Sequence, residues 1–279
     1  MTIEFYQTID EIADYLTGKG YALPNAYKRR DPQEPGRAIK ERWEDKLYRL
    51  MNKYFKGQKN RLALHLGDRL AVRVMTAKSA ADDLLRDIPE NVWRDPEIDA
   101  QLLRLFIAAG EDGVDLFSET ASIGIEWAQV NTQAASWARE YLSDRLLQLD
   151  EYTQARLREA IQGFIEIPGT TIADVVNFLP LDPKRALRVA VTEITEVFAQ
   201  AEQIAGLETK QQYQDVKVIK TWFTNADDRV CPICAPLNNT SVDVDQVFET
   251  LAGDKLHPPA HVNCRCWIAT RTVIYNADL

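Results

Sequence analysis

The residue types that could carry chemistry gather near the end of the chain. Cys231 and Cys234 form a Cys-Pro-Ile-Cys pair, and residues 257–266 form a second cluster, His-Pro-Pro-Ala-His-Val-Asn-Cys-Arg-Cys. Together they hold all four cysteines and two of the three histidines; the third histidine is His65. Thiolate and imidazole are ligands that zinc prefers in proteins. Their concentration in a chain otherwise free of cysteine predicts a small metal-stapled module.

The two clusters offer more ligands than one zinc ion needs, because zinc takes four in a tetrahedron. A Cys-x-x-Cys pair suits one edge of that tetrahedron, since a tight turn brings its two sulfurs together. We expect Cys231, Cys234 and Cys264 as three ligands. For the fourth position we place His261 ahead of Cys266, and we expect the metal to be a structural Zn²⁺.

Alternatives to this ligand set stay open. His257 is a sixth candidate. The thiols could instead pack in reduced form as small hydrophobic side chains, or two of them could form a redox disulfide. A closed site of four protein ligands has no position left for substrate, so zinc binding would be linked to folding of the segment.

Sequence motifs for catalysis are missing, which predicts that the protein is not an enzyme. A zinc deaminase needs His-x-Glu upstream of Pro-Cys-x-x-Cys, but Val230 precedes the cysteine pair and the upstream histidine begins His65-Leu-Gly. No His-Glu-x-x-His helix, Gly-x-Ser-x-Gly elbow or Walker glycine pattern occurs. We interpret the paired carboxylates, Asp227-Asp228 and Glu193 near Glu196, as helix caps and solvated charges.

The charge of the chain is unevenly distributed. The total is -9, yet residues 28–61 contain twelve basic and five acidic residues, a local balance of +7 that leaves -16 elsewhere. This segment is either a solvated helix face or a contact surface for DNA or an acidic partner. The basic residues are Lys28, Arg29, Arg30, Arg37, Lys40, Arg42, Lys46, Arg49, Lys53, Lys56, Lys59 and Arg61.

Hydropathy argues against a membrane protein. The best apolar run, residues 102–109, is interrupted by Arg104 and is shorter than the roughly 18 to 20 residues of a spanning helix. The N-terminus shows neither a basic region nor a long apolar stretch, so no signal peptide is visible. We therefore expect a cytosolic chain, where closely placed thiols favour a metal over disulfides.

Periodicity predicts an α+β protein with a mainly α-helical N-terminal two-thirds, residues 1–180. A small α/β module stapled by the zinc site follows within residues 181–279, the zinc module itself spanning 220–275. A basic helix is expected at about 37–60, where apolar residues recur at helical spacing.

Local signals place the other elements. A capping box at Thr8–Glu11 and Asp-Pro pairs at residues 95–96 and 182–183 mark helix starts. Further helices are predicted at residues 102–109, 127–149 and 153–164, and from residue 171. We expect Gly206 to end the helix that begins at Pro183. Strands are predicted at 216–223 and 266–275, and a short helix at 245–251.

The residues around the ligands resemble a known family. Residues 220–237 contain a Trp, an Asp-x-Arg and the Cys-x-x-Cys followed by Leu237, and residues 258–266 read Pro-Pro-x-His-x-Asn-Cys-Arg-Cys. This order is similar to the C-terminal domain of the phage Mu F-like head morphogenesis, or minor capsid, proteins. An upstream Thr-Glu on a helix is typical of them, and Thr192-Glu193 matches it. The resemblance covers about residues 183–275; where the family often has a glycine, this chain has Asn238-Asn239, either of which tolerates a left-handed turn.

The resemblance implies a virion component of a tailed phage, made in the bacterial host cytoplasm. It implies a role in head assembly in the capsid interior or at the portal vertex, with portal and capsid proteins as partners, no membrane and no established catalysis. In that setting the basic segment becomes a candidate contact with the portal or packaged DNA, through Lys46, Arg49, Lys53 and Lys56.

Two other function classes remain. A cytosolic zinc-module nucleic-acid-binding protein would need a basic surface around the module, but residues 225–255 carry six acidic residues against two basic ones. A toxin-like effector would need an unrecognised enzymatic pocket in the helical part, for which the sequence offers no motif.

Overall fold

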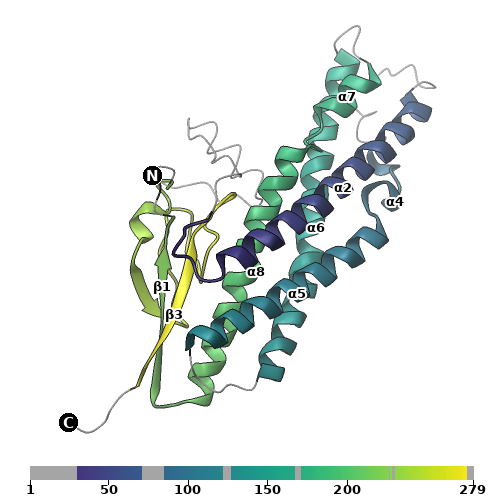
Figure 1. The fold of residues 1–279 in the computed structure, drawn as a ribbon. Coiled ribbons are helices and arrows are strands. Elements are labelled where there is room, and N and C mark those ends of the chain that lie inside the picture. The colour runs from purple at the N-terminus through teal and green to yellow at the C-terminus, as the bar shows by residue number, and fades with distance from the viewer. Residues whose placement is uncertain are drawn as a thin grey trace.

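The computed structural model describes residues 30–70, 85–121, 127–166, 171–225, 227 and 230–274. Long helices form a bundle, and a small sheet lies against one side of it, beside the C-terminal half of the helix Pro183–Gln212 (Figure 1). The predicted capping box at Thr8–Glu11 lies outside the described residues. The elements are α2 (Arg37–Leu70), α4 (Glu90–Trp93), α5 (Pro96–Ala121), α6 (Trp127–Glu166), α7 (Ile172–Phe178), α8 (Pro183–Gln212), β1 (Val216–Phe223), the 3₁₀ turn η1 (Ala235–Leu237), β2 (Thr240–Asp243) and β3 (Trp267–Ile274).

Helix starts follow the predicted capping chemistry. The Asp95 carboxylate accepts hydrogen bonds from the backbone N–H groups of residues 97 and 98, and Asp182 accepts one from the Arg185 N–H. Thr171 and Asp174 form a reciprocal capping box at α7. Each carboxylate or hydroxyl pairs a backbone donor that the helix itself leaves without a partner.

The long helices share one apolar core. Apolar side chains of α2, α5, α6, α7 and the first half of α8 form it, which agrees with the predicted apolar stripe of the basic helix. The predicted segments 127–149 and 153–164 are one continuous helix, α6, in which the Thr153 hydroxyl donates to the Leu149 carbonyl. Fully buried members of the core include Leu47, Tyr54, Phe55, Leu62, Leu102, Phe106, Leu157 and Ile194.

Helix α8 packs against both the bundle and the sheet. Its first half lies in the bundle core, while Ala199 joins the core under the sheet. The prediction that Gly206 ends this helix is wrong, because α8 continues to Gln212. Gly206 lies where the helix crosses the sheet, and a Cβ there would stand 2.8 Å from the Val244 side chain. Close approach, rather than helix termination, explains the glycine.

The C-terminal sheet has three antiparallel strands in the order β2-β1-β3. Strand β1 matches the predicted range 216–223, and β3 lies within the predicted 266–275. The fold is therefore mostly helical with a small antiparallel sheet, as the predicted α+β class requires. The predicted helix at 245–251 is wrong: this segment is a turn closed by a bridge between Phe248 and Lys255.

Among the described residues, no helix combines the length and the apolar character that crossing a membrane requires.

Candidate metal centre

Strand pairing explains why the two cysteine clusters meet. Phe223, the last residue of β1, pairs with Trp267, the first residue of β3. The segment that leaves β1 and the segment that enters β3 therefore lie at the same end of the sheet. The first segment carries Cys231 and Cys234, and the second carries residues 261–266. Antiparallel pairing thus joins ligands that are 30 residues apart in the chain.

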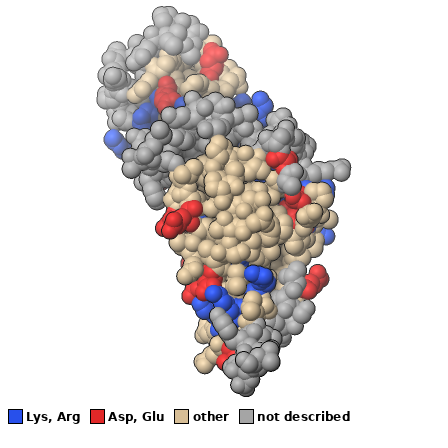
Figure 2. Space-filling view, turned by 90° about the vertical axis from the view of Figure 1, so that its left-hand side faces the viewer, with Lys and Arg blue, Asp and Glu red and all other residues tan. Residues whose placement is uncertain are grey.

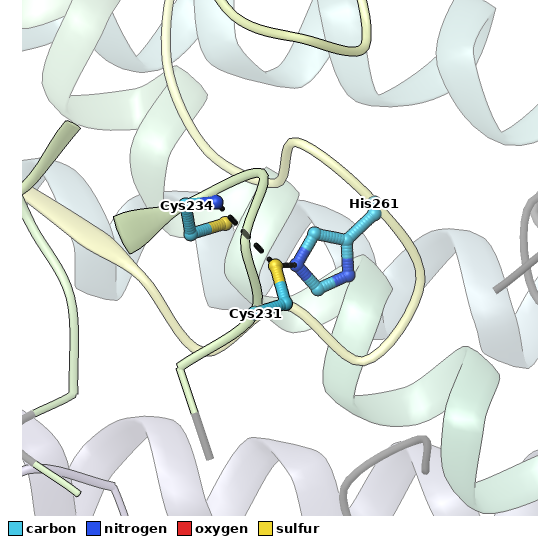
Figure 3. A group of neighbouring side chains, drawn as sticks. All are labelled: Cys231, Cys234 and His261. Carbon is cyan, nitrogen blue, oxygen red and sulfur yellow. Dashed lines mark hydrogen bonds between the residues drawn. The ribbon is translucent and has the colours of Figure 1, made fainter. Parts of the chain in front are cut away.

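Five side chains converge at this end of the sheet in two overlapping groups. Cys231, Cys234 and His261 offer ligand atoms that all lie within 4.8 Å of one another, and Cys234, Cys264 and Cys266 do the same. Figure 3 shows the first group, with the imidazole of His261 facing the sulfur of Cys231 across 2.9 Å. Cys234 belongs to both groups and joins them.

The spacing of the sulfurs suits a tetrahedral metal. With zinc–sulfur bonds of about 2.3 Å, two thiolates on one zinc ion stand roughly 3.8 Å apart. The Cys234 and Cys264 sulfurs are 3.8 Å apart. All four cysteines are free, so no disulfide competes for the sulfurs. The donor set, which is sulfur with one imidazole nitrogen, fits zinc.

The thiols and the imidazole shift one another's protonation. A hydrogen bond from Cys234, together with His261, lowers the pKa of Cys231 to about 5. Burial alone would raise the pKa of Cys264, yet hydrogen bonds from Cys234 and Cys266 hold it well below its usual value. Burial opposes protonation of His261, but the thiolates of Cys264 and Cys231 raise its pKa to about 9. Hydrogen bonds from Cys231 and Cys264 raise the pKa of Cys234 well above its usual value, and the pKa of Cys266 is raised as well. Metal binding would therefore release protons from these two thiols and from His261, because metal ligands must be deprotonated.

His261 presents one defined nitrogen to the cluster. Its Nδ1 lies 2.7 Å from the carbonyl oxygen of Val262, so this nitrogen carries the proton. Its Nε2 then remains as the nitrogen that faces Cys231. A backbone carbonyl that fixes the tautomer in this way is typical of metal-binding histidines.

The structure removes His257 from the candidate ligands. One ring nitrogen lies 2.6 Å from Gln200 on α8, and the other lies 2.8 Å from the carbonyl oxygen of Pro258. Burial lowers the pKa of His257 to about 4, so the ring is neutral. His257 therefore holds the loop against α8 and has no nitrogen directed at the cysteines.

The four ligands expected from the sequence are all present in the cluster, and so is Cys266. Cys231, Cys234, His261 and Cys266 line a small pocket, whereas Cys264 lies beside it, against Cys234. Which four of the five side chains would hold the ion therefore stays a prediction.

Two hydroxyl groups of α8 fix the backbone of residues 261–266, which we call the ligand loop. Thr192 accepts a hydrogen bond from the Asn263 N–H at 2.9 Å, and Thr195 donates one to the Cys264 carbonyl at 3.0 Å. Asn263 itself adopts a left-handed conformation, with φ of 57°. Thr192 was predicted only as part of the Thr-Glu pair, with no role of its own, and Thr195 was not predicted. Their spacing of three residues, which puts both on one helix face, was the available signal.

A second polar contact holds the segment after β1. Arg265 donates to the Asp227 carboxylate at 2.9 Å, and both side chains lie close to the ligand loop. Asn225, with its amide oriented to suit its neighbours, donates to the Arg265 carbonyl and accepts from its guanidinium. Asp227, which the sequence analysis interpreted as a cap or solvated charge, therefore ties the two ligand segments together. Asn239 adopts the left-handed turn expected of the Asn238-Asn239 pair, with φ of 63°.

The interpretation of Glu193 as a solvated charge is wrong. Its carboxylate is buried and accepts hydrogen bonds from Tyr141 at 2.6 Å and Arg145 at 2.8 Å, both on α6. The two neighbouring residues thus contact different parts of the molecule. Thr192 holds the ligand loop, and Glu193 anchors α8 to α6 in the bundle. A Thr-Glu pair on one helix can therefore connect the two regions.

The predicted basic segment separates into internal and exposed parts. Arg30 and Lys40 are buried in ion pairs with Glu34. The four side chains named as a partner surface, Lys46, Arg49, Lys53 and Lys56, are all exposed on α2. Arg49 pairs with Asp45, and the Lys46 ammonium lies 3.9 Å from the centroid of the Trp43 ring.

The surface around the sheet is not basic. Figure 2 shows the face of the molecule on the side of the sheet, where most of the described surface is formed by uncharged residues. Two lysines of this region are neutralised, since Lys210 pairs with Asp245 and Lys217 pairs with Asp243. This charge pattern disfavours a nucleic-acid-binding zinc module.

Comparison with protein families identifies this region. A family model described as Phage Mu protein F like protein matches residues 154–269. The match begins inside α6, includes α7, α8, β1 and both cysteine clusters, and ends inside β3. It confirms the resemblance of the C-terminal part of the chain to the phage Mu F-like family. No curated protein and no solved structure matches the chain significantly.

Proposed function

We propose that this protein, whose residues 154–269 match the phage Mu F-like family model, is a minor capsid or head morphogenesis protein of a tailed phage. The observation that carries the proposal is the family match over residues 154–269, within which the motif residues converge on one site. We place the protein in the capsid interior or at the portal vertex, with portal and capsid proteins as partners.

Mass spectrometry of purified proheads and mature particles tests this placement. We expect peptides of this chain in at least one of the two, and cross-links between the chain and the portal protein. Absence from both kinds of particle, with portal and major capsid peptides readily detected, would contradict the proposal.

We propose further that the five-residue cluster binds one structural Zn²⁺ ion. Cys231, Cys234, Cys264 and His261 are the favoured ligands, with Cys266 as the alternative to His261. Elemental analysis of protein purified under reducing conditions should give close to one equivalent of zinc. Less than about half an equivalent would contradict the metal, whichever ligands are used.

The metal site is proposed to have no catalytic role. Its polar neighbours hold backbone groups or one another: Thr195 holds the Cys264 carbonyl, and Arg265 holds Asp227. The toxin-like alternative is tested by expressing the chain in a bacterial host. Growth arrest that depends on the intact protein would favour an effector over an assembly protein.

The exposed cations of α2 are the proposed contact for packaged DNA or an acidic surface of the portal. Lys53 and Lys56 follow Lys46 and Arg49 at helical spacing on the exposed side of α2. Reversing Lys46, Lys53 and Lys56 to glutamate should weaken association at least tenfold at low salt. Binding that is unchanged and insensitive to salt would contradict this contact. Lys184→Glu is the control, because Lys184 is likewise exposed but lies in the first turn of α8.

A further inference from the structure

We propose that the ligand loop and the start of α2 form one cooperative unit, linked through Arg30 and Thr195, so that metal binding at the C-terminal end fixes the N-terminal end of the helical bundle. This inference rests on the proposed metal site. It assigns to Arg30 and Thr195 a positioning role that connects two regions far apart in the sequence.

The link begins at a single hydroxyl group. Thr195 Oγ accepts a hydrogen bond from the Arg30 guanidinium at 2.9 Å and donates one to the Cys264 carbonyl at 3.0 Å. Both side chains are buried, with 2% of Arg30 and 3% of Thr195 exposed. A hydroxyl has one proton to give, so the two contacts have fixed directions: Thr195 accepts from Arg30 and donates to the Cys264 carbonyl.

Arg30 is fully committed at its other nitrogens. Its Nη1 donates to Glu34 at 2.8 Å and its Nε donates to Glu44 at 2.9 Å. Lys40 donates to the same Glu34 oxygen at 2.8 Å. The segment before α2 and the first turns of α2 are therefore held together by one buried group of charges. Removing a partner from such a group leaves a buried charge without compensation.

Cys266 lies between this charge group and the metal site. It lines the pocket beside Cys231 and His261, and it also lines a second pocket formed by Arg30, Lys40 and Thr195. The two sites thus share a wall as well as a hydrogen bond. A change in the position of residues 264–266 must alter the surroundings of Arg30, because densely packed interiors transmit displacement.

The direction of coupling follows from these contacts. With metal bound, the ligand loop holds the Cys264 carbonyl where Thr195 can reach it. Without metal, the loop loses its cross-link and the Thr195 hydroxyl loses its acceptor, so the hydroxyl is free to rotate and no longer has a fixed orientation toward the Arg30 guanidinium. The first turns of α2 should then open more often, while the middle of α2, packed in the apolar core, should not. Folding of the C-terminal module around metal would therefore make the start of α2 more ordered.

Hydrogen exchange of the full chain, read by mass spectrometry, tests the link. Zinc-loaded protein is compared with protein treated with a chelator, and the metal content of both is measured. We expect chelation to accelerate exchange at least tenfold in residues 37–44 and to leave residues 50–60 unchanged. Unchanged exchange in residues 37–44, in protein that has lost its metal and shows faster exchange in residues 230–266, would overturn the inference.

Substitutions at the link separate it from a general loss of stability. Thr195→Val removes the hydroxyl at nearly constant volume, so residues 37–44 should exchange faster with zinc bound and respond little to chelation. Thr195→Ser should restore the response. Arg49→Gln is the control, because Arg49 forms an exposed pair with Asp45 on the same helix. A Thr195→Val protein that still responds to chelation like the wild type contradicts the proposed link.

A chain that binds no metal would contradict the proposed zinc site without deciding the link. In that case Cys234→Ser, which disrupts the cluster directly, takes the place of chelation. Faster exchange in residues 37–44 of that variant supports the link, and wild-type exchange there overturns it.

Discussion

The helical bundle and the C-terminal sheet are stabilised in different ways. The bundle buries long rows of apolar side chains from α2, α5, α6, α7 and α8. The core beside the sheet is much smaller, and three of its buried members are the cysteines Cys234, Cys264 and Cys266. A large core is stable through burial of apolar surface, whereas a small one needs cross-links. The comparison teaches what the proposed metal would do: by cross-linking the cysteine cluster it would compensate for the apolar mass that the core beside the sheet lacks.

Loss of the metal should have the largest effect on stability, and this effect should be confined to the region of the sheet. We expect Cys234→Ser to abolish zinc binding and to unfold residues 230–266, because structural zinc contributes about 10–16 kcal/mol of apparent binding energy in small peptides. Most helical circular dichroism should remain. Elemental analysis and hydrogen exchange check the two parts of this prediction.

His257→Gln is the matched control for the metal prediction. His257 contacts Gln200 and a backbone carbonyl rather than the cluster, so this variant should keep its full zinc content. Loss of zinc in His257→Gln would return this residue to the ligand set.

Breaking the buried ion pair between α6 and α8 should have the next largest effect on stability, in this case within the helical bundle. Arg145→Ala leaves the buried Glu193 carboxylate with Tyr141 alone, at a cost of about 3–5 kcal/mol in the free energy of unfolding. Zinc content should not change. Chemical denaturation measures the effect, and Arg49→Ala, which removes an exposed pair, should cost less than about 1 kcal/mol. A loss for Arg145→Ala as small as that of the control would contradict this role of Glu193.

The bundle also contains a carboxyl group that opposes its stability at neutral pH. Burial raises the pKa of Asp150 to about 6, although Gln58 and Tyr54 donate hydrogen bonds to it. An acid whose pKa is raised on folding binds a proton more tightly in the native state. Its destabilising effect is therefore absent below the unfolded pKa of about 4 and grows until the pH passes about 6.

Asp150→Asn should remove this pH dependence. We expect it to raise the free energy of unfolding at pH 7 by about 1–2 kcal/mol, less than the full shift of roughly 3 kcal/mol because the new amide needs an acceptor of its own. Denaturation at pH 4, 5, 6 and 7 measures the difference. A variant less stable than the wild type at pH 7 would show that the charged form is needed.

The smallest predicted effect concerns a helix start. Thr171→Ala removes the capping box of α7 and should lower the free energy of unfolding by about 1 kcal/mol. Thr171→Ser keeps the hydroxyl and should stay within a few tenths of the wild type. Equal losses in both variants would mean that the methyl group, rather than the cap, matters at this position.

Local signals were sufficient to predict much of the fold. The Asp-Pro starts at 95 and 182, the strand at 216–223 and the convergence of the two cysteine clusters follow from short stretches of sequence. The errors arose where contacts between distant residues decide the structure. Glycine is typical of helix ends, which is why Gly206 was predicted to end α8. Its actual role depends on Val244, which lies too close to the helix for a side chain at position 206.

The same limit applied at the site. The motif around residues 231–266 indicated candidate ligands that do lie together, and a family resemblance that the family model confirms for residues 154–269, yet Arg30 lies far upstream in a segment interpreted by its charge alone. Glu193 looked like a surface charge because its partners, Tyr141 and Arg145, are about 50 residues away on α6. Only the packing of α6 on α8 distinguishes a buried carboxylate from an exposed one.

Helix α8 has a mechanical consequence. It spans 30 residues, which corresponds to about 45 Å of rigid helix, and it enters both the bundle core and the core beside the sheet. A force applied at either end of the molecule is therefore carried along a single rod rather than through a flexible linker. The sheet and the bundle should therefore keep a fixed relative orientation, so any partner that binds one of them also sets the orientation of the other.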